Sequence, residues 1–296
     1  MPEGDTVHQA RLRLLPVLQD STVERLWVRR IRGHRPRSGQ RIETVRAQGK
    51  HLLIDFDRAL TLQVHLGLGG WWQVQAGVGE EEEAFARYRR NPRLRLYLAT
   101  DNGIATCYSA PTIQTFLRPA VTAAAATTPT ITPLSNLGPD LTVGKQDREA
   151  TVVRAVQRLR VRSAPTELIA DALLDQQVAA GTGNVYKSEI LFINGVWPFT
   201  PVGDLSDDQL HELFDSASHL LWINSQRPDT RRTTTPFSGS LADLHGGVFV
   251  YRRHRAPCRR CAAPIERSYD GRLGRSTYWC PRCQPAPPAG RRPAAG

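Results

Sequence analysis

The chain has 296 residues, and its 39 Lys and Arg against 28 Asp and Glu give a formal net charge of +11. This length suffices for two domains with separate cores, and the positive balance favours a polyanionic partner such as nucleic acid. No run approaches the roughly 18 uninterrupted apolar residues of a membrane span, and the first residues lack the basic and apolar segments of a secretory signal. The composition therefore predicts a cytoplasmic protein without a membrane partner, associated with the nucleoid if it is bacterial.

The N-terminal part predicts a β-sandwich with flanking helices. Apolar residues recur at helical spacing from Asp5 to Leu18, and Asp5 or Thr6 can cap the first turn. Between residues 22 and 108, short β-rich runs alternate with Gly, Asn, Asp and charged stretches, which is typical of a sandwich or barrel. The acidic run at 80–83 is interpreted as a solvent-exposed loop without function.

The remainder of the sequence is predicted to be mainly helical, and together with the N-terminal sandwich this predicts an α+β multidomain chain. After a stretch rich in Thr, Ala and Pro the apolar spacing becomes helical, and a Gly-Thr-Gly-Asn turn separates two of these helices. The end of the chain is rich in Pro, Ala and Gly, a composition that disfavours folding. The predicted parts are a sandwich domain at 1–120, a linker at 121–144, a helical domain at 145–250, a zinc finger at 251–284 and a disordered tail at 285–296.

Two Cys-x-x-Cys pairs near the C-terminus predict a metal site. Their separation by eighteen residues is typical of four thiolates that close a tetrahedral Zn²⁺ site. Four protein ligands leave no open position for water, so we predict one structural zinc ion. The turn signal Asp270-Gly271 lies between the pairs and favours a β-hairpin finger. The expected ligands are Cys258, Cys261, Cys280 and Cys283.

Four segments carry a resemblance to a known family. They are MPEGD at the N-terminus, GKHLL at 49–53, AGTGNVYKSE at 180–189 and GRSTYWCPRCQ at 274–284. With these motifs in order along nearly its whole length, the chain resembles the formamidopyrimidine-DNA glycosylase and endonuclease VIII family. The resemblance implies a monomeric bifunctional enzyme of base excision repair, a DNA glycosylase and abasic-site lyase that acts on damaged DNA.

The resemblance also implies four catalytic residues. The small side chain of Pro2 permits removal of Met1, and the exposed secondary amine, with a pKa near 8, is partly neutral at pH 7 and can form a Schiff base at a sugar C1′. Glu3 can protonate the opening deoxyribose or relay protons. The resemblance implies that Lys50 reaches the phosphate of the lesion and assists β-elimination. It also implies that Arg275 contacts flanking phosphates and helps δ-elimination.

Four further residues are expected to contact DNA. Leu68 occupies the methionine position of the family's void-filling loop, where an apolar side chain enters the base stack after the damaged nucleotide flips out. Asn184 begins a helix after a glycine turn, a phosphate-binding arrangement that resembles the family's helix-two-turn-helix. Lys187 in the same segment and Arg272 in the hairpin complete the set. The ordinary alternative for Asn184 is a helix cap.

Several departures from the family pattern favour the endonuclease VIII branch. Leu68 stands in place of methionine, no Pro-Arg-Arg-Phe loop occurs near Arg118, and Asp5 replaces the frequent glutamate. The interval from Thr234 to Tyr251 is short for the loop that caps 8-oxoguanine. Oxidised pyrimidines are therefore the favoured substrates, with excision of 8-oxoguanine or formamidopyrimidine as the alternative. A noncatalytic zinc-finger DNA-binding protein is the alternative of another class, but it leaves the N-terminal motif unexplained.

Overall fold

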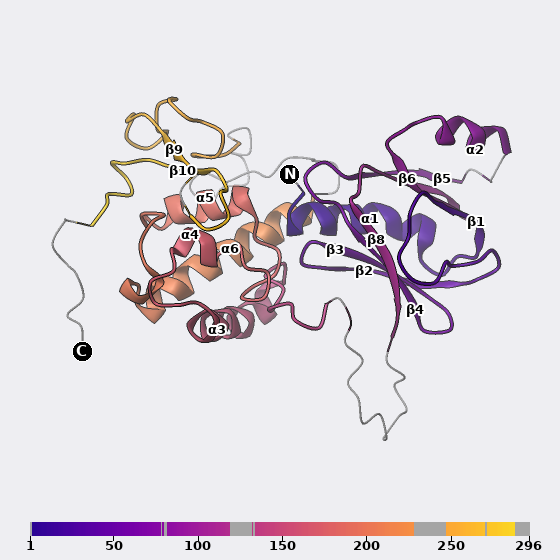
Figure 1. Ribbon diagram of the computed structural model, residues 1–296, viewed down its shortest axis with the longest axis horizontal. Helices are drawn as coiled ribbons and strands as arrows, with labels where there is room; N and C mark the ends of the chain where they lie inside the picture. The colour runs from indigo at the N-terminus through magenta and orange to yellow at the C-terminus, as the bar shows by residue number, and fades with distance from the viewer. Residues whose placement is uncertain are drawn as a thin grey trace, which may run out of the picture. The chain divides into compact units, whose positions relative to one another are not determined.

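The computed structural model describes residues 2–77, 79, 82–118, 132, 134–227, 247–269 and 271–287. The chain divides into two compact units, residues 1–136 with 225–231 and residues 137–224 with 232–296 (Figure 1). Each unit has its own buried apolar core. Among the described helices, none is both long and apolar enough to cross a bilayer.

The first unit is an antiparallel β-sandwich with helix α1 packed against strands of both sheets (Figure 1). One four-stranded sheet has the order β1-β6-β7-β5, and the other has the order β2-β3-β4-β8. This confirms the predicted sandwich. The elements are α1 (Gly4–Leu18), β1 (Val23–Val28), β2 (Ile42–Gln48), β3 (His51–Phe56), β4 (Leu60–His65), β5 (Trp71–Ala76), α2 (Glu82–Arg89), β6 (Leu94–Thr100), β7 (Gly103–Tyr108) and β8 (Thr112–Leu117).

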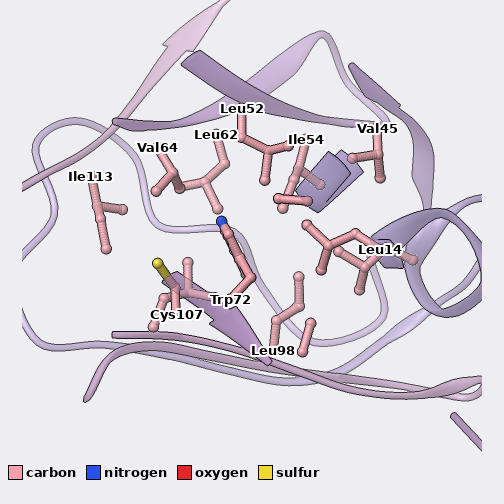
Figure 2. Packing of buried hydrophobic residues seen from close by; sticks show 14 of the residues in the cluster. Leu14, Val45, Leu52, Ile54, Leu62, Val64, Trp72, Leu98, Cys107 and Ile113 are labelled. Atoms are coloured by element: carbon pink, nitrogen blue, oxygen red, sulfur yellow. The ribbon is translucent and has the colours of Figure 1, made fainter. Parts of the chain in front are cut away.

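Side chains from both sheets meet in one apolar core, which Figure 2 shows from close by. Alternate residues of a strand point to one face, so a strand contributes every second side chain to this core. Trp72 of β5 lies in it, and this residue also lines the pocket that Pro2 borders. The other labelled members are Leu14, Val45, Leu52, Ile54, Leu62, Val64, Leu98, Cys107 and Ile113.

The second unit combines helices with a short hairpin. Apolar residues of α3, α5 and α6 form its main core, and a separate cluster packs Val185 and Phe192 of α5 against Ile265 and Tyr278 of the cysteine-bearing segment. Helix α5 therefore supports the hairpin. The elements are α3 (Lys145–Arg162), α4 (Ile169–Ala172), α5 (Asn184–Ile193), the 3₁₀ helix η1 (Val202–Asp204), α6 (Asp207–Ser225), β9 (Glu266–Ser268) and β10 (Thr277–Trp279).

Two segments differ from the sequence-based expectation. Residues 137–144, placed in the linker, belong to the second unit, where Leu141 is fully buried in the helical core. The acidic run predicted as a loop ends in helix α2, which begins at Glu82. This helix forms because Phe85 is buried and its ring lies 5.0 Å from that of Tyr97. Tertiary contacts determine the structure of both segments, and the local amino-acid composition does not reveal those contacts.

The connection within the hairpin is longer than the tight turn expected at Asp270-Gly271. Strands β9 and β10 pair with Ser268 opposite Thr277, so the connection covers residues 269–276. Asp270 itself lies outside the described residues. So do residues 119–131 and 133, which contain half of the predicted linker, and residues 288–296 of the predicted tail.

Candidate active site

The N-terminus of helix α1 carries the predicted nucleophile. Glu3 is the N-cap residue of α1 and is fully buried, and Pro2 directly before it is half-buried. Pro2 borders a pocket of about 160 Å³. Its other lining residues are Thr6, Ala10, Arg13, Leu66, Gly70, Trp71 and Trp72. After removal of Met1, the nitrogen of Pro2 becomes a secondary amine at this pocket, adjacent in sequence to a buried carboxyl group.

Lys50 lies in the turn between β2 and β3, next to a pair of histidines. The turn is tight because Gly49 adopts a φ of +53°, which glycine tolerates. The register of β3 and β4 places His51 opposite His65, with ring centroids 5.0 Å apart. Burial, His65 and Lys50 lower the pKa of His51 to about 4, and burial followed by the charge of Lys50 lowers the pKa of His65. Both imidazoles are therefore neutral at pH 7.

Hydrogen bonds fix the tautomers of these two histidines. The side-chain amide nitrogen of Gln63 contacts Nδ1 of His51 at 2.7 Å, and the backbone N–H of Gly67 donates to Nδ1 of His65 at 3.2 Å. Because both partners are donors, both Nδ1 atoms are acceptors and the ring protons lie on Nε2. Sequence reasoning missed this pair. The signal that could have found it is the strand register, which brings the first residue of β3 to the last residue of β4.

The loop from Leu66 to Gly70 displays the predicted wedge residue. Its backbone closes through the N–H of Gly70, which donates to the carbonyl oxygen of Leu66 at 2.8 Å. Gly67 has a φ of +59°, and a Cβ there would lie 2.6 Å from Cγ of Pro111. The loop therefore needs glycine at position 67. At its tip the side chain of Leu68 is 64% exposed, beside a pocket that Leu66 and Gly70 line.

In the second unit, Asn184 and Lys187 hold the hairpin. Asn184 begins α5 and donates from Nδ2 to the carbonyl oxygen of Ser276 at 2.8 Å. Lys187 is only 1% exposed, and its Nζ donates to Oγ1 of Thr277 at 2.8 Å and to the carbonyl oxygen of Ser276 at 3.2 Å. As placed, this ammonium serves an internal contact, so the structure gives no support to a direct DNA contact by Lys187. Both residues position β10.

The two hairpin arginines differ in their surroundings. The backbone N–H of Arg272 donates to Oδ2 of Asp171 at 2.7 Å, and its guanidinium contacts Oε1 of Glu167 at 3.2 Å while its side chain stays 69% exposed. Arg275 is exposed and forms no ion pair with the residues that the structure describes. Arg275 therefore offers the less compensated positive charge. The candidate residues thus fall in two units, Pro2, Lys50 and Leu68 in one and the hairpin residues in the other.

The four cysteines of the hairpin form one cluster. Their sulfur atoms all lie within 4.8 Å of one another, with 3.9 Å between Cys258 and Cys283 and 3.4 Å between Cys261 and Cys280. Tetrahedral coordination with metal–sulfur bonds of about 2.3 Å requires sulfur separations of about 3.8 Å. Backbone N–H groups also point at the sulfur atoms, as that of Arg260 does at 3.4 Å from Cys258. The cluster can hold a metal ion.

Comparisons with known proteins agree with this arrangement. The family description of the formamidopyrimidine-DNA glycosylase N-terminal domain matches residues 1–111, and that of the formamidopyrimidine-DNA glycosylase H2TH domain matches residues 137–226. "Probable endonuclease 8 2" of Streptomyces coelicolor is 38% identical over 99% of this chain and 98% of its own length. "DNA-(apurinic or apyrimidinic site) lyase Nei2" of Mycolicibacterium smegmatis is 34% identical over 97% of this chain and 100% of its own length.

Solved structures share the fold. The MutM (Fpg) protein from Thermus thermophilus matches with a TM-score of 0.72 and 25% identity, covering 97% of this chain and 100% of that one. Lactococcus lactis formamidopyrimidine-DNA glycosylase bound to DNA with an abasic site matches with a TM-score of 0.70 and 19% identity, covering 96% and 100%. The chain therefore belongs to the formamidopyrimidine-DNA glycosylase and endonuclease VIII family, in its endonuclease VIII-like branch. This confirms the resemblance found in the sequence.

Proposed function

We propose that this protein is a bifunctional DNA glycosylase and abasic-site lyase of base excision repair, which removes oxidised bases and cleaves the strand. The observation that supports this most is the half-buried Pro2 at a pocket, next to the fully buried Glu3 and beside the loop that displays Leu68. Family membership and a relative named as an abasic-site lyase support the same chemistry. We propose further that the enzyme acts as a monomer on damaged DNA in the cytoplasm, and at the nucleoid if it is bacterial.

The first chemical stage is base excision. The lone pair of the Pro2 amine forms a bond to C1′ of the damaged nucleotide, and the bond from C1′ to the base breaks, so that the base departs with a proton. Opening of the sugar then breaks the bond from C1′ to O4′, and O4′ takes up a proton. The carboxyl group of Glu3 is the proposed donor of that proton. A secondary amine such as Pro2 leaves a cationic iminium at C1′.

The second stage is strand cleavage. The iminium accepts an electron pair, so it acidifies the proton on C2′, and loss of that proton expels the 3′ phosphate by β-elimination. A further elimination expels the 5′ phosphate. We propose that Lys50 contacts the phosphate of the lesion and that Arg275 contacts a flanking phosphate, because each lends positive charge to a departing anion. Leu68 enters the base stack in place of the flipped nucleotide.

The second unit supplies DNA binding. We propose that Arg272 and Arg275 contact the DNA backbone, and that Asn184 and Lys187 contribute by fixing the loop that carries these arginines. One Zn²⁺ ion held by the four thiolates would close the hairpin, and its role is structural because all four positions are protein ligands. The contacts of Ser276 with α5 and the sulfur separations both fit this arrangement.

Oxidised pyrimidines are the proposed substrates. The chain lacks the Pro-Arg-Arg-Phe segment, and Arg118 instead binds the carboxylates of Glu43 and Asp55 of its own unit. As placed, the guanidinium of Arg118 is engaged by these two carboxylates. Full-length relatives named endonuclease 8 support the same branch. Comparing excision of thymine glycol, 5-hydroxyuracil and 8-oxoguanine tests the preference, and faster excision of 8-oxoguanine would overturn it.

Borohydride trapping tests the chemistry directly. The purified protein is incubated with DNA that contains an abasic site, and borohydride reduces any iminium to a stable amine. We expect a covalent adduct whose cross-linked peptide is the mature N-terminus. A chain that keeps an N-terminal extension, which turns the Pro2 amine into an amide, should form no adduct although it binds DNA.

A control separates the nucleophile from its neighbours. The Lys50→Ala variant should still form the adduct, because its amine is not the attacking group. An adduct that survives the extension and disappears in Lys50→Ala would assign the nucleophile to lysine. Absence of any adduct with DNA binding intact would favour a noncatalytic DNA-binding protein.

A further inference from the structure

The first unit contains a second, larger pocket to which arginine contributes more lining residues than any other residue type. It is an open pocket of about 640 Å³, and it lies apart from the residues that line the Pro2 pocket. We call it the arginine pocket. Its lining residues are Arg29, Arg30, Ile31, Arg32, Pro92, Arg95, Pro111, Thr112 and Ile113. Four of these are arginines, and none is acidic.

The backbone builds this pocket by crossing between the two sheets. Strand β1 ends at Val28, and the N–H of Arg29 still donates to the carbonyl oxygen of Arg95 at 3.0 Å. Three residues later, the N–H of Arg32 donates to the carbonyl oxygen of Ile113 in the other sheet at 3.2 Å. The segment is therefore held at both ends by backbone hydrogen bonds. The fold therefore brings the arginines of this segment to the same pocket as Arg95 of β6.

The positive charge of the pocket is not compensated within the described chain. None of its four guanidinium groups forms an ion pair with a described residue. Guanidinium groups match phosphate oxygens in geometry and charge. The arrangement therefore fits an anionic ligand with phosphate geometry.

The position of the pocket identifies the source of that phosphate. Pro111 lines the pocket and also packs against Gly67, which belongs to the loop that displays Leu68. Leu66 and Gly70 of the same loop line the Pro2 pocket. The exposed Leu68 therefore stands on a loop that lines the Pro2 pocket and packs against one lining residue of the arginine pocket. DNA held with its lesion at Pro2 and Leu68 in its stack presents backbone phosphates to this neighbourhood.

We propose that the arginine pocket is a phosphate-binding site for the DNA backbone beyond Leu68, and that it holds the duplex while a nucleotide is flipped out. This inference rests on the proposed function, since it takes the lesion to lie at Pro2. Phosphodiester groups of either strand have the required chemistry, so the test distinguishes the strands. Phosphate contacts of this kind position a duplex without reading its sequence.

The first test is the salt dependence of binding to a duplex with a tetrahydrofuran abasic analogue. The double variant Arg30→Ala with Arg32→Ala should lower the slope of log K against log salt by about 1 for each phosphate that it no longer binds. The matched control is Arg37→Ala with Arg58→Ala, two exposed arginines of the same unit that line a different pocket. The control removes the same charge and should leave the slope closer to that of the unchanged protein.

The second test locates the phosphate. Each backbone phosphate of either strand is replaced in turn by a neutral methylphosphonate. At one or two positions on one strand, the replacement should weaken binding about tenfold for the unchanged protein and for the control, as expected for a charged hydrogen bond, and should have no effect on the pocket variant. If the pocket variant responds like the unchanged protein at every position of both strands, the proposal is wrong.

Borohydride trapping keeps this inference separate from the proposed function. At saturating abasic DNA the pocket variant should form as much adduct as the unchanged protein, because its arginines do not touch the reacting atoms. If the unchanged protein forms no adduct, the proposed chemistry fails, but the methylphosphonate scan still reports whether the pocket binds a phosphate.

Discussion

The backbone N–H of Gly67 donates a hydrogen bond to Nδ1 of His65, 3.2 Å away. This bond ties the loop that carries Leu68 to the histidine pair beside Lys50. It exists only while Nδ1 of His65 has a free lone pair, so it requires a neutral ring. Burial and the charge of Lys50 lower the pKa of His65 and keep the ring neutral. The shape of the loop is therefore linked to pH.

The free energy of unfolding should fall as the pH decreases from about 6.5 to about 4. The pKa of His51 is lowered to about 4 by burial, His65 and Lys50, whereas the unfolded chain keeps a value near 6.5. The unfolded state therefore takes up protons first. The contribution of His51 to stability is fully present above the pKa of the unfolded state and is lost as the pH falls toward the pKa of the folded state. The loss from this residue is on the order of 3 kcal/mol.

Urea unfolding at about pH 7.5 and about pH 4.5 measures this loss. The His51→Gln variant should lose less stability between the two pH values, because it has no proton to gain. The control His34→Gln changes an exposed histidine and should follow the unchanged protein. Identical pH dependence of His51→Gln and the unchanged protein would contradict the linkage.

Two substitutions in the loop should separate stability from function. Leu68→Ala removes an exposed side chain, so the free energy of unfolding should change by less than about 0.5 kcal/mol while base excision slows. Gly67→Ala places a Cβ 2.6 Å from Pro111 at a φ of +59°, so it should be destabilising by more than about 1 kcal/mol. Thermal unfolding and single-turnover excision of an oxidised pyrimidine provide the measurements. A stability loss in Leu68→Ala would mean that this leucine packs on its own chain.

Metal analysis should find about one zinc ion per chain. Removing it with a chelator should abolish DNA binding and expose the hairpin to protease, because the two short strands do not form a core of their own. The Cys283→Ala variant should lose most of the zinc. Cys107→Ala is the matched control, since Cys107 is buried in the sandwich, and it should keep the zinc although it loses some stability. Full zinc content in Cys283→Ala would show that the cluster is not the binding site.

Lys187→Met tests whether this lysine positions the hairpin. The change leaves Oγ1 of Thr277 and the carbonyl oxygen of Ser276 without their ammonium donor, so the free energy of unfolding should fall by about 1–3 kcal/mol. DNA affinity should weaken together with stability. Lys145→Met, at an exposed position of the same unit, should leave the stability unchanged. Weaker DNA binding at unchanged stability of Lys187→Met would instead indicate a direct contact.

The chemistry-bearing motifs were legible in the sequence because each occupies a short segment. Pro2 and Glu3 are neighbours, the cysteine pairs follow a fixed spacing, and Gly49 with Lys50 precedes an apolar run. The β-rich runs and the helical spacing likewise indicated the sandwich and the helical part, since periodicity is a local property. What was missed involves partners far apart in the chain, such as His51 with His65 and Arg29 with Arg95.

By itself the sequence determined which groups are present and which elements they form: a nucleophilic amine beside a carboxyl group, four thiolates at metal-binding spacing, and an apolar pattern for each strand. Only the tertiary structure decided what each side chain meets. It buried Lys187 against β10, placed Leu68 at an exposed tip, and gathered four arginines at one pocket. The physical reason is that strand register and helix packing bring distant residues together, and no local pattern encodes those contacts.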